Sequence, residues 1–111
     1  MARLSPQRGD VFWVNLDPTL GTEIKKTRPA VVVSNDSCNR FGARVVVAPL
    51  TSNVSGVYPG EALVTVANRP GRVLGDQLRS LDKIRLGRRM GRLSAADLAS
   101  VDEALRITLD L

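Results

Sequence analysis

Short apolar segments rich in β-branched residues run through most of this 111-residue chain. The clearest are DVFWVNL (residues 10–16), AVVV (30–33) and RVVVAPL (44–50). Each is bounded by turn-forming residues such as Gly, Pro, Asp or Ser, and segments of this length and composition are typical of half-buried or buried strands. The chain is therefore expected to build a small β-sheet rather than a helical bundle.

The rest of the chain supplies further strands and the loops between them. ALVTV (62–66) reads as another strand, and residues 77–81 alternate loosely and are expected to continue as a strand toward 84–86. Residues 35–42 have room for one helical turn. The expected loops are residues 17–27, a turn at 52–60 and residues 68–71, where Asn, Pro and Gly collect.

The hydrophobic period changes near the C-terminus. Apolar residues recur there at helical spacing, namely Leu98, Val101, Ala104, Leu105 and Leu109. Ser94 is the expected N-cap, and Asp97 three residues later forms a variant of the capping box. Strands followed by one helix from about 95 to 109 predict an α+β domain, 1–111, on a small, strongly bent antiparallel sheet or barrel.

The charge balance favours a polyanionic partner. Sixteen basic residues stand against 11 acidic ones, a net charge of +5, and most of the basic residues are Arg. Arg matches a phosphate group bidentately, so nucleic acid is the leading partner class. Six of the cations fall within residues 79–92. No apolar stretch approaches the ~18–20 residues of a membrane span.

Missing residue types restrict the chemistry. The chain has no His and a single Cys, Cys38, so a Ser-His-Asp triad, a two-histidine ribonuclease and a tetrahedral zinc site are excluded. The acidic residues are scattered without a paired motif, so we expect no metal and no cofactor. The first residues lack the apolar middle of a signal peptide, which with the lone Cys predicts a cytoplasmic location.

Cations crowd against a proline at the start of a buried strand. Lys25, Lys26 and Arg28 precede Pro29, which is tolerated at the first residue of a strand. Pro29 also restricts Arg28 to an extended conformation, which would hold its guanidinium at the strand mouth. Two interpretations remain at this point, a solvated loop rim and an anion-binding site.

The motifs together resemble those of the MazF/PemK family of toxin endoribonucleases. The matching segments, in family order, are RGDVFWVNLDP (8–18), GTEIKKTRPAVVVSND (21–36), VVVAPLTS (45–52), YPGE (58–61), LGDQLRSLDKIRLGRRMGRLS (74–94) and VDEALRITL (101–109). The resemblance implies an SH3-like barrel with a C-terminal helix, a homodimer, and metal-independent cleavage of single-stranded RNA. It also implies neutralisation by a cognate antitoxin with an acidic C-terminal segment.

The resemblance carries site residues onto this chain. It implies catalytic roles for Arg28 and Thr51, and Glu23 falls on the family's acidic loop position. Glu23 is a better general base than Arg28 on grounds of pKa, and Arg28 or Lys25 would assist the leaving oxygen. Further RNA contacts are expected from the following residues: Lys25, Lys26, Thr27, Ser52 and Gln77. Alternatively, Thr51 is a turn hydroxyl, Glu23 pairs with Lys26, and Gln77 only satisfies backbone groups.

Two other functions compete with RNA cleavage. One is a basic SH3-like module that binds RNA or ribosomes without cleaving. The other is a toxin of the gyrase-poison type, which shares the barrel but attacks a protein. Arg28 and Thr51 at two strand ends favour cleavage over a binding module, since binding alone needs neither. The resemblance implies that the gyrase-poison type relies on C-terminal residues, so the R-P and PLTS motifs favour RNA over a protein target.

Overall fold

The computed structural model describes residues 5–17, 21–23 and 26–111, and its fold is α+β. A strongly bent antiparallel sheet carries a C-terminal helix, which confirms the predicted class. The strands are β1 (Asp10–Asn15), β2 (Thr27–Val32), β3 (Arg44–Thr51), β4 (Glu61–Val66), β5 (Arg69–Leu74), β6 (Arg79–Asp82) and β7 (Leu86–Arg92). The helices are α1 (Asp36–Phe41) and α2 (Ala95–Leu109), with short 3₁₀ turns η1 (Gly75–Gln77) and η2 (Lys83–Arg85).

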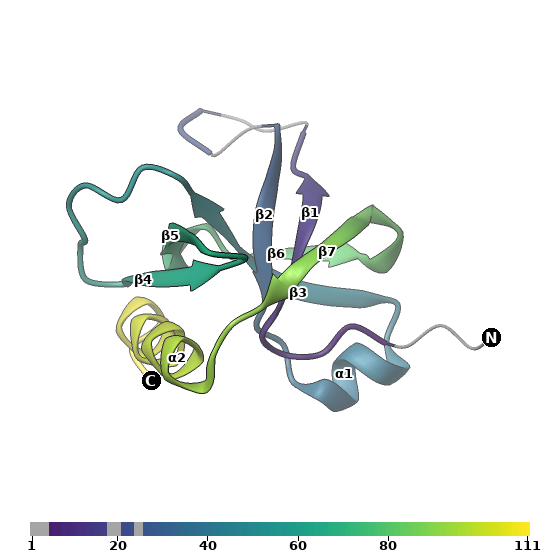
Figure 1. The fold of residues 1–111 in the computed structure, drawn as a ribbon. Coiled ribbons are helices and arrows are strands. Elements are labelled where there is room, and N and C mark those ends of the chain that lie inside the picture. The colour runs from purple at the N-terminus through teal and green to yellow at the C-terminus, as the bar shows by residue number, and fades with distance from the viewer. Residues whose placement is uncertain (1–4, 18–20, 24–25) are drawn as a thin grey trace.

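The sheet bends around its longest strand, β3. Its strands follow the order β4-β5-β3-β2-β1-β7, and β6 also pairs with β3. The first half of β3, from Arg44, pairs with β6, whereas its last residues, Leu50 and Thr51, pair with β5. Because one strand serves two partners along the same edge, the β4–β5 hairpin turns away from the rest of the sheet (Figure 1).

The central strands are buried on both faces, which explains their continuous apolar sequences. Val31 on β2 faces a core that also contains Val11, Leu50 and Val101 of α2. Its neighbours Ala30 and Val32 face a second core. Successive side chains of a strand point to opposite faces, so a strand with a core on each side carries no polar alternation.

Helix α2 begins where the sequence predicts. The Ser94 hydroxyl accepts a hydrogen bond from the N–H of Asp97 at 3.1 Å. The Asp97 carboxylate does not complete a capping box; it accepts from the backbone N–H of Thr65 on β4 at 2.9 Å, tying the helix to the hairpin. Leu109, at helical spacing with the buried residues, is half exposed. Within the described residues, no helix is long and apolar enough to cross a membrane.

Two strands are absent from the sequence prediction. Residues 68–71, predicted as a loop, largely belong to β5, which pairs with β4 along its whole length. Pro70 is accommodated because β3 pairs only with Arg72 and Val73 of this strand, so the missing N–H interrupts no ladder on that side. The strand predicted to continue toward 84–86 is interrupted by η2, after which β7 crosses back to β1.

Candidate active site

The register of β2 and β3 brings Arg28 and Thr51 together. Ala30 pairs with Pro49 across these antiparallel strands. Continued to the strand ends, the same register puts Arg28 opposite Thr51, and both residues line one pocket of about 320 Å³. The sequence prediction that two strand ends meet at one cleft is therefore correct in geometry, while the roles of the two side chains remain a prediction.

The cleft has an apolar floor and a polar rim. Its lining residues come from β1, the start of β2 with Lys26 before it, the end of β3 with Ser52 after it, the β4–β5 hairpin and β7. The apolar members are Trp13, Pro29, Leu50, Val66, Pro70 and Met90, and Gly71 also contributes. The polar members are Lys26, Thr27, Arg28, Thr51, Ser52 and Arg69. Such a site offers flat apolar surface to a base or ring, and cations to a phosphate.

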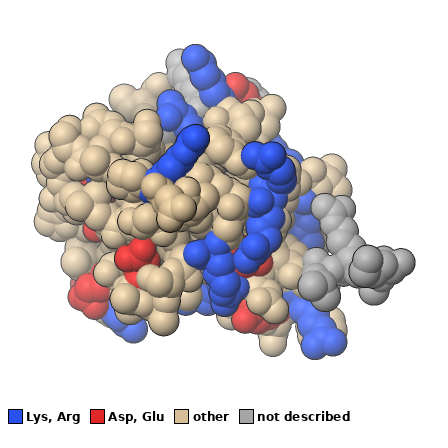
Figure 2. Space-filling view, viewed as in Figure 1, with Lys and Arg blue, Asp and Glu red and all other residues tan. Residues whose placement is uncertain are grey.

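Positive charge dominates the cleft and its surroundings. Lys26, Arg28 and Arg69 line the pocket, and none of its described lining residues is acidic. Close by, β7 carries Arg88, whereas Arg89 and Arg92 of the same strand form ion pairs with Asp10. Figure 2 shows Lys and Arg side chains gathered over the middle of the face that β7 crosses. Cations around a concave apolar surface favour a polyanion that also has ring systems, a description that fits single-stranded nucleic acid.

The other predicted contact residues divide into three groups. Thr27, Lys26 and Ser52 line the cleft as expected. Lys25 lies outside the described residues. Glu23 is on an exposed turn and Gln77 is in η1, and neither is among the residues that line the cleft. The role of Glu23 as a base therefore stays a prediction that requires the β1–β2 loop to carry it toward the cleft.

Arg69 and Trp13 are among the cleft residues that were not recognised as site residues in the sequence. Arg69 follows Ala67 and Asn68, whose φ angles of 51° and 61° form the tight turn of the β4–β5 hairpin. A two-residue turn between strands could have been sought there, but Ala is not a usual residue for it. Trp13 is only half-buried and lines the cleft, because it shares the Val11 face of β1 near the point where the sheet opens.

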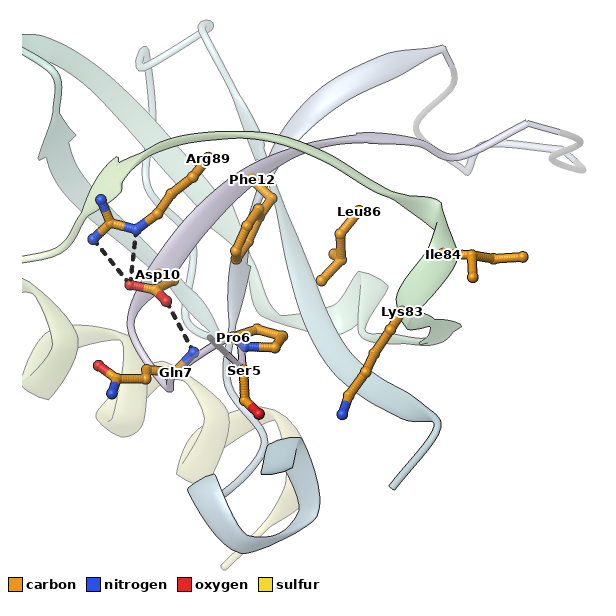
Figure 3. A pocket seen from close by; sticks show the side chains of 9 residues that line it. All are labelled: Ser5, Pro6, Gln7, Asp10, Phe12, Lys83, Ile84, Leu86 and Arg89. Atoms are coloured by element: carbon orange, nitrogen blue, oxygen red, sulfur yellow. Dashed lines mark hydrogen bonds and ion pairs between the residues drawn. The ribbon is translucent and has the colours of Figure 1, made fainter. Parts of the chain in front are cut away.

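A second, larger hollow of about 610 Å³ lies on the other side of β1. Phe12 of β1 and Leu86 of β7 project into it, toward Pro6 of the N-terminal segment (Figure 3). At one end Asp10, 6% exposed, accepts from Arg89 and Arg92, each at 3.1 Å. Ile84 at the opposite rim is 89% exposed.

The described residues do not assemble a metal site. Among the described residues, no cluster of three or more His, Cys, Asp or Glu side chains could hold a metal ion. The cations and hydroxyls of the cleft are donors to an anion rather than ligands to a cation.

The bent antiparallel sheet, its C-terminal helix and a cation-rimmed cleft near two strand ends define a class of small, strongly curved β-domains with an anion-binding cleft. Residues 7–109 match the family described as PemK-like, MazF-like toxin of type II toxin-antitoxin system. The chain belongs to this family.

Relatives support the assignment over nearly the whole chain. Endoribonuclease MazF9 of Mycobacterium tuberculosis (strain ATCC 25618 / H37Rv) is 43% identical, with 95% of this chain and 97% of the relative covered. Endoribonuclease EndoA of Bacillus subtilis (strain 168) is 34% identical, with 95% of each covered.

Solved structures give the same result for the fold. MazF from Deinococcus radiodurans has a TM-score of 0.85 and 32% identity, covering 98% of this chain and 100% of that one. A mycobacterial endoribonuclease in complex with its cognate antitoxin has a TM-score of 0.82 and 28% identity, covering 96% of this chain and 97% of that one.

Proposed function

We propose that this chain is a toxin endoribonuclease that cleaves single-stranded RNA, including mRNA, at short specific sequences. The observation that carries the proposal is that Arg28 and Thr51, near the ends of the neighbouring strands β2 and β3, line one cation-rimmed cleft. Relatives named as endoribonucleases support it over nearly the full length. A pure binding module would need neither this pair nor its register, and no feature favours a gyrase-directed toxin.

The proposed chemistry uses the nucleophile that RNA itself carries. The ribose 2′-OH attacks the adjacent phosphorus, the bond from phosphorus to the 5′-oxygen breaks, and the products are a 2′,3′-cyclic phosphate and a 5′-OH. A base, for which Glu23 is the candidate, takes the 2′-OH proton, and the leaving 5′-oxygen gains a proton with the assistance of Arg28 or Lys25. Arg28 stabilises the charge that grows on the phosphoryl oxygens, and the Thr51 hydroxyl donates a further hydrogen bond.

Metal independence is the first test of this chemistry. Purified protein should cut a mixed RNA into discrete fragments in the presence of EDTA, because no step needs a metal. An RNA oligonucleotide that contains a cleaved sequence, made with a 2′-deoxy nucleotide at the scissile position, should bind and stay intact. Fragments that vanish with EDTA and return with magnesium, or that carry 5′-phosphates, would contradict the mechanism.

An acidic antitoxin segment is the proposed partner of the same cleft. Lys26, Arg28 and Arg69 would pair with its carboxylates, and the apolar floor with Trp13 and Met90 would take its apolar side chains. Such a segment would fold as it docks, in the cytoplasm where mRNA is also found. A cognate antitoxin peptide should therefore displace the 2′-deoxy RNA. Simultaneous binding without mutual weakening would exclude occlusion as the mode of inhibition.

A homodimer is the proposed assembly, and the hollow beside β1 is its proposed contact face. Ile84 is 89% exposed and Phe41 is 81% exposed. The two segments that carry them are joined by the backbone hydrogen bond from the N–H of Lys83 to the carbonyl of Ala43. Phe12 and Leu86 line the hollow next to them. Apolar side chains that gather around a hollow in this way mark contact sites on soluble proteins.

A further inference from the structure

The 52–60 loop, which joins β3 to β4, is held by a guanidinium from a third strand. Arg72 of β5 donates through Nη1 to the carbonyl of Gly56 at 2.6 Å and to that of Ser55 at 3.4 Å. Both carbonyls are in the middle of the loop, and residues 52–59 are exposed. Arg72 therefore reaches the loop from underneath rather than covering it.

The same guanidinium is connected to the far end of the loop. Arg72 forms an ion pair with Glu61 at 3.6 Å, and each side chain is only 14% exposed. Glu61 in turn accepts from the backbone N–H of Tyr58 at 3.1 Å. One buried pair thus fixes the middle of the loop and its return into β4.

The near end of the loop starts at the cleft. Thr51 is the register partner of Arg72 across β3 and β5. The Thr51 hydroxyl accepts from the N–H of Asn53 at 3.3 Å, and Ser52 lines the cleft. The loop therefore leaves the proposed reacting centre directly and is placed to meet the nucleotides beside it.

Burial of Arg72 has a cost that its contacts must offset. Its Nε is buried and has no hydrogen-bond partner among the described residues. An unsatisfied buried donor opposes folding, so the guanidinium is kept in place by the loop carbonyls and by Glu61. Without them the side chain would extend into water.

We propose that Arg72, paired with Glu61, is a positioning residue that preorganises the 52–60 loop for RNA binding; this rests on the proposed function. The loop loses its conformational freedom during folding, so RNA need not supply that ordering free energy when it binds. In a variant without the guanidinium, the loop would have to become ordered when RNA binds, and this cost would reduce the binding free energy. The consequence is weaker binding of RNA, with the chemistry at Arg28 and Thr51 retained.

The test compares Arg72→Met with Arg44→Met. Methionine keeps the apolar stem of Arg72 and removes its charge and donors. Arg44 is a matched control at the other end of β3, where it contacts Ser80 through Nε at 2.9 Å and Nη2 at 3.0 Å. Amide hydrogen exchange without RNA reports the loop, steady-state cleavage reports KM and kcat, and thermal melting reports the fold.

Arg72→Met should accelerate exchange in residues 52–60 while the core strands keep their protection. KM for an RNA oligonucleotide cut by the wild type should rise roughly tenfold, with kcat near the wild-type value, since loss of preorganisation weakens ground-state and transition-state binding equally. Arg72→Lys, which keeps a charge opposite Glu61 but lacks the planar guanidinium fork, should restore KM only in part. Arg44→Met should change neither exchange in the loop nor KM.

Three results would overturn the proposal. Unchanged loop exchange in Arg72→Met would show that the guanidinium does not order the loop. Faster exchange with unchanged KM would show that the loop does not bind RNA, and a fall in kcat at constant KM would place Arg72 in the chemistry instead. A wild type that cleaves no RNA refutes the proposed function and the RNA role together, whereas the exchange result still decides whether Arg72 orders the loop.

Discussion

At the scale of single residues, Arg28 is defined by what holds it. It lies between Val14 of β1, its register partner, and the strand end that carries Thr51. Pro29 follows it, so the backbone at Arg28 is confined to extended conformations. The guanidinium is half-buried, which lowers the dielectric around it and strengthens its interaction with a phosphate. Under the proposed mechanism, the position should require the fork of Arg and not only a positive charge.

Replacement of Arg28 tests this requirement. Arg28→Ala should lower kcat about 10²–10³-fold, by analogy with loss of one donor to a developing oxyanion. Arg28→Lys should also lose most of the activity, because an ammonium cannot make two parallel hydrogen bonds to phosphoryl oxygens. Single-turnover cleavage of an RNA oligonucleotide measures both. Near-normal turnover in Arg28→Lys would mean that the bidentate role is wrong.

Arg69 tests whether the β4–β5 hairpin belongs to the RNA site. It is exposed at the rim of the cleft, so we expect a phosphate contact there. Arg69→Ala should weaken binding of 2′-deoxy RNA for all sequences alike and lower the slope of log affinity against log salt by about 0.7. Arg106→Ala removes an equal charge from α2, where Arg106 pairs with Glu103 at 3.3 Å, and should leave that slope unchanged.

At the scale of elements, α2 closes the end of the core. Val101 and Ala104 are buried against the β4–β5 hairpin side of the sheet, in the core that also includes Leu50 and Val73. The helix meets the hairpin through Asp97 and Thr65 as well. Since the hairpin supplies Arg69 to the cleft, the start of α2 supports the site from behind.

The N-cap of α2 therefore contributes to stability. Ser94→Ala removes the acceptor for the N–H of Asp97 and should lower the free energy of unfolding by about 1 kcal/mol. Ser100→Ala is the control, because its exposed hydroxyl only donates back to the carbonyl of Ala96 at 3.3 Å within the same helix. Urea unfolding at fixed protein concentration compares the two. Equal stability of both variants would show that the cap is dispensable.

At the scale of the whole molecule, the cleft and the larger hollow lie on opposite sides of β1. Trp13 lines the cleft, whereas its neighbour Phe12 lines the hollow. Successive side chains of β1 point to opposite faces of the sheet, so the proposed RNA surface and the proposed dimer surface are one residue apart along this strand. A dimer formed through the hollow would leave both clefts open to RNA and would double the positive charge available to it.

The dimer proposal predicts which apolar residues control assembly. Ile84→Asp, or the same change at Phe41, should convert the dimer to a 12.0 kDa monomer, because a carboxylate at a dry contact is left unpaired. Leu63→Asp is the control, since Leu63 is 49% exposed on β4, away from the hollow. Sedimentation velocity measures the state. A wild-type monomer, or a dimer that persists in Ile84→Asp, would refute this contact face.

The sequence determined the elements whose signals are local. Strands β1, β2 and β3 can be recognised from their apolar segments, and the C-terminal helix from the helical spacing of apolar residues after Ser94. In each case the pattern of buried side chains is visible within a few consecutive residues. The expectation that Arg28 and Thr51 share one cleft comes from the family resemblance, because local signals mark the two strand ends but do not say that they are neighbours. Each residue ends a strand that is recognisable by itself.

Only the tertiary structure decided that residues 69–74 and 86–92 are strands and that Arg69 and Met90 belong to the cleft. Both segments contain Gly or Pro, which locally indicate loops. A Cβ at Gly87 would lie 2.7 Å from the carbonyl oxygen of Trp13, and one at Gly91 would lie 2.9 Å from Val66. These glycines permit close approach to distant segments, and no nearby residue carries that information.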